Sequence, residues 1–282
     1  VDRPASSLAF AGPMHLLFVT HYFHPEVGAP QTRILEAARL LRRRGHEVTV
    51  LTGFPNYPDG IIPEPYRGRI LQTEDVEGIR VVRSWVLPAP NRGFARRIVN
   101  HTTSAVSAVL ASPKVRRVDV VIGETPPLFT AAASVLIAKG HRAKLLLNVA
   151  DLWPESAVQL GMLRNRHAIR AAELLERFAY RHSATITVPT AGMRRILIEQ
   201  GHPADRVVHL PNAVDTDRFV PPAAPSERLT KVLYSGTVGL AQGVGTLLDA
   251  AGILAGDDAG LTVRIVGDGA ERADLQRSAA ER

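Results

Sequence analysis

The stretch MHLLFVTHYFHPEVGAPQTRILEAARLLRRRGHEVTVLTG, residues 14–53, contains two strands with a helix between them. The apolar run HLLFVT (15–20) predicts a buried strand. In PQTRILEAARLLRRRG (30–45), apolar residues recur at helical spacing, the proline suits the first helical turn, and the glycine ends the helix. EVTVLTG (47–53) predicts a second strand. A strand, a helix and a strand in succession favour a parallel sheet with the helix packed on it.

The same alternation continues along the chain. Further strands are predicted at GIRVVRSWVL (78–87), VDVVIGE (118–124), AKLLLNVAD (143–151), ATITVP (184–189) and RVVHLP (206–211). Helices are predicted at 93–112, 128–138, 164–182 and 191–201, and the proline-rich segment at 54–68 is predicted to be a loop. The fold class is therefore α/β, with a parallel sheet covered on both faces.

A change of composition near residue 220 marks a second domain. VPPAAPSERLT (220–230) has the chemistry of a linker, and a new strand, KVLYSG, follows it. Only one more strand, LTVRIVG, comes before residue 282, whereas a doubly wound domain has about five or six. We predict a flexible leader at 1–13, a domain at 14–215, a linker at 216–230 and a truncated second domain at 231–282.

Composition excludes several classes of protein. Apolar residues make up 45% of the chain, and cysteine is absent, so disulfides and cysteine-based zinc sites are excluded. The longest strongly apolar run, PPLFTAAASVLIA (126–138), is too short to span a bilayer. The first residues lack the order of a signal peptide. We expect a cytoplasmic protein.

The basic charge is concentrated in one segment. The net charge is +7, and eight Lys and Arg residues but no Asp or Glu lie between Gly78 and Val118. Such a patch indicates an anionic partner, namely acidic lipid, a phosphate-bearing substrate or nucleic acid, unless it is only a solvated face. The aromatic content of 5% and the lack of a known nucleic-acid module disfavour nucleic acid.

Candidate ligand loops follow the strands, because ligands of such sheets bind beyond the carboxyl ends of the strands. In HYFHPEVGAPQ (21–31), Gly28 lets a ligand approach the backbone, and the helix behind it offers free N–H groups to an anion. The alternative is a tight turn. The loop does not fit G-x-G-x-x-G, which disfavours a dinucleotide-dependent oxidoreductase.

Three more loops have the same position after a strand. VADLWPES (149–156) presents Asp151 and Glu155 on either side of Trp153, and these carboxylates suit acid–base or sugar-hydroxyl contacts; a helix cap is the alternative for Asp151. SGTVGLAQG (235–243) is a glycine-rich loop before a helix. In VGDG (266–269), the aspartate suits either a turn or a nucleotide contact.

Taken in order, these segments resemble the retaining GT-B glycosyltransferases of family 4, which take a sugar from a nucleoside diphosphate. The resemblance covers residues 14–275 and includes PTAGMRRILIEQGHPADRVVHLPNAVDTDRF (189–219), which leads into the linker. DLWPES is similar to a branch that builds bacterial surface polysaccharides and lipid-linked oligosaccharides. The resemblance implies two Rossmann-like domains, with the donor between them.

Carried over position by position, the resemblance implies roles for individual residues. Asp151 is assigned next to the transferred sugar as the catalytic residue. Donor-binding residues would be Gly28, Ser235, Gly236, Thr237, Gly243, Gly267 and Asp268. The acceptor side, or its supporting residues, would include Glu124, Trp153 and Glu155. The basic start of the helix at 93–112, with Arg92, Arg96 and Arg97, would dock on anionic lipid.

The chain departs from the family pattern at several positions. Thr237 and Gln242 stand where many members have Arg and Lys, Ala213 stands where Gly is usual, and Ala150 replaces an Arg. No two glutamates are separated by seven residues, so the Glu-x7-Glu pair that holds ribose and sugar in the family is missing. We expect neither a metal nor another cofactor.

The resulting expectation is a retaining glycosyltransferase that uses a nucleoside diphosphate sugar, preferably a UDP-sugar. The acceptor would be a glycan or a polyprenyl-diphosphate-linked sugar in cell-surface polysaccharide synthesis. The protein would be cytoplasmic or peripheral on the inner face of the membrane, with no nucleic-acid partner. Two alternatives stay open: an inactive fragment that binds sugar nucleotide or lipid, and a GT-B-fold sugar-nucleotide epimerase.

Overall fold

The computed structural model describes residues 12–89, 94–221, 231–255 and 261–281. The chain forms two compact units, Val1–Ala213 and Val214–Arg282. The division falls two residues before the end of the first domain predicted from the sequence. The predicted leader lies almost entirely outside the described residues, as does most of the predicted linker.

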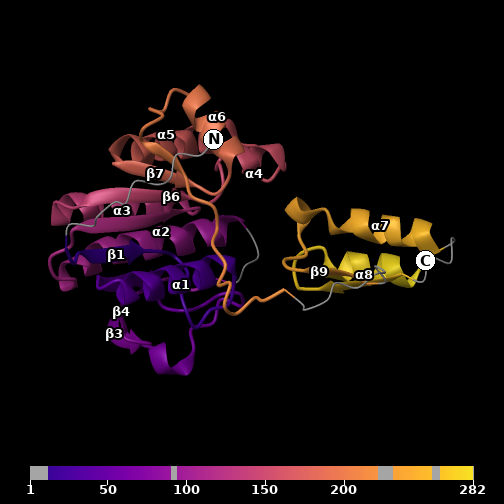
Figure 1. The fold of residues 1–282 in the computed structure, drawn as a ribbon, viewed down its shortest axis with the longest axis horizontal. Coiled ribbons are helices and arrows are strands. Elements are labelled where there is room, and N and C mark those ends of the chain that lie inside the picture. The colour runs from indigo at the N-terminus through magenta and orange to yellow at the C-terminus, as the bar shows by residue number, and fades with distance from the viewer. Residues whose placement is uncertain (1–11, 90–93, 222–230, 256–260, 282) are drawn as a thin grey trace. The chain divides into compact units, whose positions relative to one another are not determined.

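An eight-stranded sheet forms the centre of the first unit (Figure 1). Its strands lie in the order β3-β4-β2-β1-β5-β6-β7-β8, and every neighbouring pair is parallel except β3 and β4. The bounds are β1 His15–Val19, β2 Glu47–Gly53, β3 Leu71–Val76, β4 Ile79–Ser84, β5 Val120–Thr125, β6 Lys144–Val149, β7 Thr185–Val188 and β8 Val207–His209.

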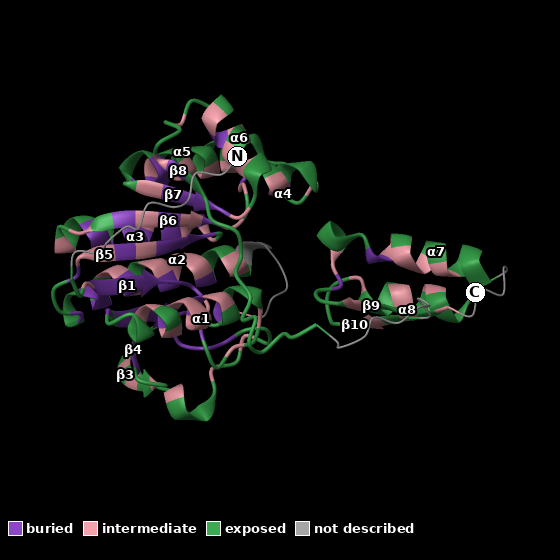
Figure 2. Ribbon diagram, viewed as in Figure 1, coloured by how far each residue is buried: buried purple, intermediate pink, exposed green. Residues whose placement is uncertain are grey.

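Helices cover both faces of this sheet, as predicted. Successive residues of each strand point to opposite faces, so Leu17 and Val19 of β1 join one core cluster and Phe18 joins the other. The first cluster packs against α2, α3 and α5, and the second against α1 (Figure 2). The helices are α1 Ala29–Arg43, α2 Phe94–Ala111, α3 Leu128–His141, α4 Glu155–Gln159, α5 Arg166–His182 and α6 Ala191–Glu199.

Strand β3 was not predicted. Its sequence, LQTEDV, is polar and only half-buried, as suits an edge strand paired on one side. β3 is antiparallel to β4, and Glu74 of β3 accepts a hydrogen bond of 2.5 Å from Nε of Arg83. The Arg83 side chain is fully buried and also lies over the ring of Tyr66. One of the eight basic residues of the predicted surface patch is therefore internal.

The second unit is small. It has two parallel strands, β9 Lys231–Ser235 and β10 Thr262–Val266, with helices α7 Val244–Ala255 and α8 Arg272–Ala280. Most of its residues are exposed or half-buried, and Val238 and Val244 are buried (Figure 2). None of the helices in the described ranges of either unit is long and apolar enough to cross a membrane.

Candidate active site

Gly28 lies at the start of α1, at the carboxyl edge of the large sheet. It is the N-cap of the helix, and no side chain caps the first turn, so backbone N–H groups are available to another acceptor. A Cβ atom at this position would lie 2.6 Å from Oε1 of Gln31. The uncapped first turn fits the predicted approach of a phosphate to the backbone, whereas the side-chain oxygen of Gln31, which has no described hydrogen-bond partner, lies beside the same glycine.

The register of three neighbouring strands brings three polar side chains together at this edge. Glu124 of β5 pairs with Asn148 of β6, and Asn148 pairs with Thr187 of β7. All three belong to the face covered by α1, because the alternate residues of these strands lie in the core on the opposite face. Asn148 donates to both carboxylate oxygens of Glu124 (3.3 and 3.2 Å), and the Thr187 hydroxyl donates to Asn148 Oδ1 (3.0 Å).

Arg33 completes this network from the second turn of α1. Its Nη2 donates to Glu124 Oε2 at 2.6 Å, and its Nη1 donates to Asn212 Oδ1 at 3.5 Å. The Glu124 side chain is 9% exposed and that of Arg33 is 24% exposed. Burial raises the pKa of Glu124, while the Arg33 charge and the hydrogen bond from Asn148 oppose this rise. Glu124 was predicted as a site residue, whereas Arg33 and Asn148 were not.

Asp151 lies two residues beyond the end of β6. The backbone N–H of Ala150 donates to the Thr125 carbonyl, which keeps this exit next to β5. The Asp151 carboxylate is exposed and accepts a hydrogen bond of 2.9 Å from the hydroxyl of Ser156 in α4. Its other oxygen is available to a ligand, so both the binding and the helix-start interpretations fit its position.

Trp153 and Glu155 belong to the same loop. Trp153 is half-buried, and the exposed Glu155 begins α4 and accepts a hydrogen bond from Gln159. Glu155 also lies near Glu176 of α5, where burial raises the pKa of Glu176 to about 7 and the charge of Glu155 adds to this rise. The loop is therefore an acidic region, which is better suited to sugar hydroxyls than to phosphate.

In the second unit, the two predicted donor loops pack directly on each other. A Cβ atom at Gly267 would lie 1.8 Å from the Gly236 carbonyl oxygen, and one at Gly269 would lie 2.1 Å from the Val238 carbonyl oxygen. Backbone hydrogen bonds join Gly236 N–H to the Val266 carbonyl and Val238 N–H to the Asp268 carbonyl. These glycines are therefore required for contact between the loops, besides any role in binding.

The remaining predicted donor residues surround this contact. Ser235 and Thr237 are exposed, and Gly243 has a left-handed backbone (φ 57°) directly before α7. The Asp268 carboxylate accepts from its neighbour Gly269 and lies 3.5 Å from Arg272 Nη1, so the turn interpretation of Asp268 accounts for these contacts. The hydroxyls and the exposed loop amides remain available to a ligand.

Helix α2 carries the predicted membrane patch. Arg92 lies outside the described residues; Arg96 is exposed, and Arg97 is half-buried. The helix buries small or polar residues, among them Asn100, Ser104 and Ala108. Four of its large apolar residues lie on the outside, with exposed fractions of 36% to 75%: Ile98, Val99, Val106 and Leu110.

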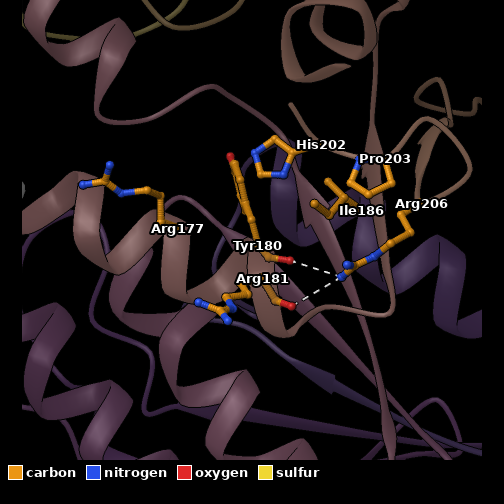
Figure 3. A pocket seen from close by; sticks show the side chains of 7 residues that line it. All are labelled: Arg177, Tyr180, Arg181, Ile186, His202, Pro203 and Arg206. Atoms are coloured by element: carbon orange, nitrogen blue, oxygen red, sulfur yellow. Dashed lines mark hydrogen bonds between the residues drawn. The ribbon is translucent and has the colours of Figure 1, made fainter. Parts of the chain in front are cut away.

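A cavity of about 350 Å³ lies at the opposite, amino end of β7 and β8 (Figure 3). Its lining includes Arg177, Arg181 and Arg206, none of them a predicted site residue. The Arg206 guanidinium donates to the carbonyls of Tyr180 and Arg181, in the last turn of α5, at 3.5 and 3.4 Å. These contacts of Arg206 are those of a helix C-terminal cap, so they have a structural explanation. The carboxyl edge of the sheet is therefore the better candidate site.

Residues 28–213 match the family described as Glycosyl transferase 4-like domain. The chain is similar to WcaI of Escherichia coli K12, named a colanic acid biosynthesis glycosyl transferase, with 28% identity over 95% of this chain and 69% of that protein. It is also similar to the GDP-mannose-dependent alpha-mannosyltransferase of Mycolicibacterium smegmatis, with 29% identity over 93% of this chain and 65% of that protein. The chain thus spans about two thirds of the length of these relatives.

Solved structures show the same fold. The catalytic domain of starch synthase IV from Arabidopsis thaliana, bound to ADP and acarbose, aligns with a TM-score of 0.62 and 15% identity, over 96% of this chain and 71% of that one. Anabaena HepE, in complex with UDP and glucose, aligns with a TM-score of 0.61 and 16% identity, over 95% and 65%. The predicted GT-B fold, with two Rossmann-like units and parallel sheets, is confirmed.

Proposed function

Because the chain belongs to the glycosyl transferase 4-like family, we propose that it transfers a sugar from a nucleoside diphosphate sugar to a hydroxyl of a glycan or lipid-linked acceptor. The role would be in cell-surface polysaccharide synthesis. The observation that carries this proposal is the grouping of Gly28, Arg33, Glu124 and Asp151 at one edge of the sheet, on the loops where such folds bind ligands. The similarity to WcaI supports the polysaccharide role.

We propose a UDP-sugar as the donor. The HepE structures hold UDP, and one holds UDP-glucose, which supports a uridine nucleotide in this fold. The rival is a GDP-sugar, since one relative is named as GDP-mannose-dependent. The loops at 235–243 and 266–269 would bind the diphosphate through exposed amides and the hydroxyls of Ser235 and Thr237.

The proposed reaction retains the configuration of the sugar. The bond between the anomeric carbon and the diphosphate oxygen breaks, the acceptor oxygen bonds to the same face of that carbon, and the acceptor proton passes to the departing phosphate. Free N–H groups at the start of α1 would stabilise the negative charge of the leaving group. Asp151 would orient the transferred sugar through its hydroxyls, and Arg33 would hold Glu124 in place.

The experiment that tests this function is a measurement of nucleotide release. UDP-glucose, UDP-galactose, UDP-N-acetylglucosamine and GDP-mannose are each incubated with the protein and a lipid-diphosphate-linked sugar. We expect UDP release that depends on the acceptor, and a loss of about 100-fold in kcat for Asp151→Ala. The control is Asp205→Ala, an exposed aspartate at the opposite edge of the sheet.

Three outcomes would contradict the proposal. Release of GDP alone would show that the donor is a GDP-sugar and not a UDP-sugar. Formation of an epimerised sugar nucleotide without sugar transfer would show that the protein is an epimerase. Equal activity of the Asp151 and Asp205 variants would remove Asp151 from the site.

We further propose that α2 docks on an anionic membrane. Its outward face combines Arg96 with the exposed Ile98, Val99, Val106 and Leu110, which is the pattern of an interfacial helix. The protein should therefore sediment with vesicles that contain phosphatidylglycerol and not with purely zwitterionic ones. Replacing Val106 and Leu110 by serine should weaken sedimentation about tenfold or more. Equal sedimentation of this variant and the unchanged protein would show that α2 is not the docking face.

A further inference from the structure

A second group of polar and aromatic side chains lies at the same edge of the sheet, beyond β1 and β2. His21 and Tyr22 follow β1, Tyr57 follows β2, and His101 comes from α2; we call these four residues the ring cluster. The His21 ring lies 4.6 Å from that of His101 and 4.3 Å from that of Tyr22, centre to centre. The Tyr22 and Tyr57 rings are 5.2 Å apart. None of these residues belongs to the site described above.

The hydrogen bonds of Asn100 determine which nitrogen of His21 carries the proton. Asn100 Nδ2 donates to the Leu87 carbonyl (2.8 Å) and to Asn56 Oδ1 (3.1 Å), so its Oδ1 faces His21 Nε2 at 2.9 Å. An amide oxygen only accepts, and His21 Nε2 therefore donates. In neutral His21, Nδ1 is then an acceptor; it is buried and has no partner among the described residues.

The two imidazoles are neutral near pH 7. The pKa of His21 is lowered to about 4 and that of His101 to about 3, chiefly by burial, and the charge of Arg97 contributes to both shifts. Arg97 itself is half-buried, and no described residue forms a hydrogen bond or ion pair with its guanidinium. A carboxylate also acts on the cluster: that of Glu26, which accepts backbone N–H groups of Asn56 and Tyr57 at 2.8 Å and opposes the effect of Arg97 on the pKa of Tyr22.

This charge balance favours a neutral ligand over a phosphate. The charges of Arg97 and Glu26 act on Tyr22 in opposite directions, and the two neutral imidazoles add no positive charge that would attract a phosphate. Tyr57 leaves 37% of its surface exposed, enough for a ligand to contact its ring. An aromatic face, a donor and neutral imidazoles together suit a saccharide, whose C–H face stacks while its hydroxyls donate and accept.

We propose that Tyr57, His101 and Arg97, supported by His21, form a saccharide-binding subsite for the acceptor. This inference rests on the proposed transferase function, because it assigns the sugar of the acceptor to these residues. The proposal also gives different roles to two neighbouring arginines of α2. The half-buried Arg97 belongs to the subsite, whereas the exposed Arg96 belongs to the surface.

The experiment measures binding without any donor, so a failure of sugar transfer leaves its result intact. The chain is labelled at histidine Cε1, and the His101 signal is identified by its absence in His101→Gln. Methyl glycosides of glucose, galactose, mannose and N-acetylglucosamine are titrated to tens of millimolar, and inorganic pyrophosphate is titrated separately. We expect at least one glycoside to shift the His101 signal.

Matched variants test the individual contacts. Tyr57→Ala should weaken glycoside binding about tenfold, while Tyr57→Phe, which keeps the ring, should stay within about twofold. Arg97→Gln should weaken binding and Arg96→Gln should not. The proposal is wrong if no glycoside shifts the His101 signal, if pyrophosphate shifts it at lower concentration than every glycoside, or if the two arginine variants bind equally.

Discussion

Replacing Arg33 by methionine is expected to lower the free energy of unfolding by about 3 kcal/mol at pH 8. The reason is the partner left behind: the Glu124 carboxylate is 9% exposed and would lose its countercharge at 2.6 Å. Asn148 would still donate to Glu124, but a neutral amide offsets only part of this loss. Urea unfolding, followed by circular dichroism, measures the change.

A double variant separates the ion pair from the packing of Arg33. In Arg33→Met with Glu124→Gln, no buried charge is left unpaired, so we expect at least half of the lost stability to return. The control is Arg195→Met, because Arg195 and Glu199 form an exposed pair at 3.9 Å and should contribute less than about 0.5 kcal/mol. If the double variant is as unstable as Arg33→Met, the ion pair is not the cause.

Acid should destabilise the protein through the two histidines of the ring cluster. Their pKa values in the folded protein are about 4 and about 3, against 6.5 for an unperturbed histidine. Between these pKa values the unfolded chain binds more protons than the folded protein. The stability contributed by the two neutral histidines is therefore fully present above about pH 6.5 and is lost as the pH decreases. We expect a loss of about 3–4 kcal/mol between pH 7.5 and pH 5.

Single variants assign this loss to its source. His101→Gln should remove about half of the pH dependence of the free energy of unfolding. The control His167→Gln, at an exposed histidine, should leave this pH dependence unchanged. The groups facing the pair are Arg97 from α2, whose charge acts on both histidines, and Tyr22, whose ring contacts His21; Glu26 and Tyr57 in turn act on Tyr22. Urea unfolding at several pH values gives the slopes. If the free energy of unfolding changes with pH by the same amount in the unchanged protein and in His101→Gln, the assignment is wrong.

The periodicity of apolar residues was enough to predict the parallel sheet and its covering helices, because buried strands are continuous apolar runs in the sequence. It could not predict β3, where LQTEDV is as polar as a loop and is a strand only because β4 lies beside it. Arg83 was counted as a surface charge for the same reason: its burial depends on Glu74 and Tyr66, which no local pattern connects to it.

The candidate site shows the same limit. Glu124 could be predicted, since it ends an apolar strand, and Asn148 has the same signal, a polar residue near the end of LLLNV. The sequence does not show the strand register that places Glu124 beside Asn148. Arg33 looked like any basic residue of an amphipathic helix. The ring cluster needs two loops and one helix to meet, and only the folded chain shows that.

The contact between the loops at 235–243 and 266–269 bears on how the donor preference that we propose for these loops can be changed by evolution. A Cβ atom at Gly267 would lie 1.8 Å from the Gly236 carbonyl oxygen, so a larger residue at Gly267 would force both loops apart. Thr237 and Gln242, in contrast, project from the same loop into solvent. A library randomised at these two positions alone would sample new chemistry on an unchanged scaffold, and we expect most of its members to fold.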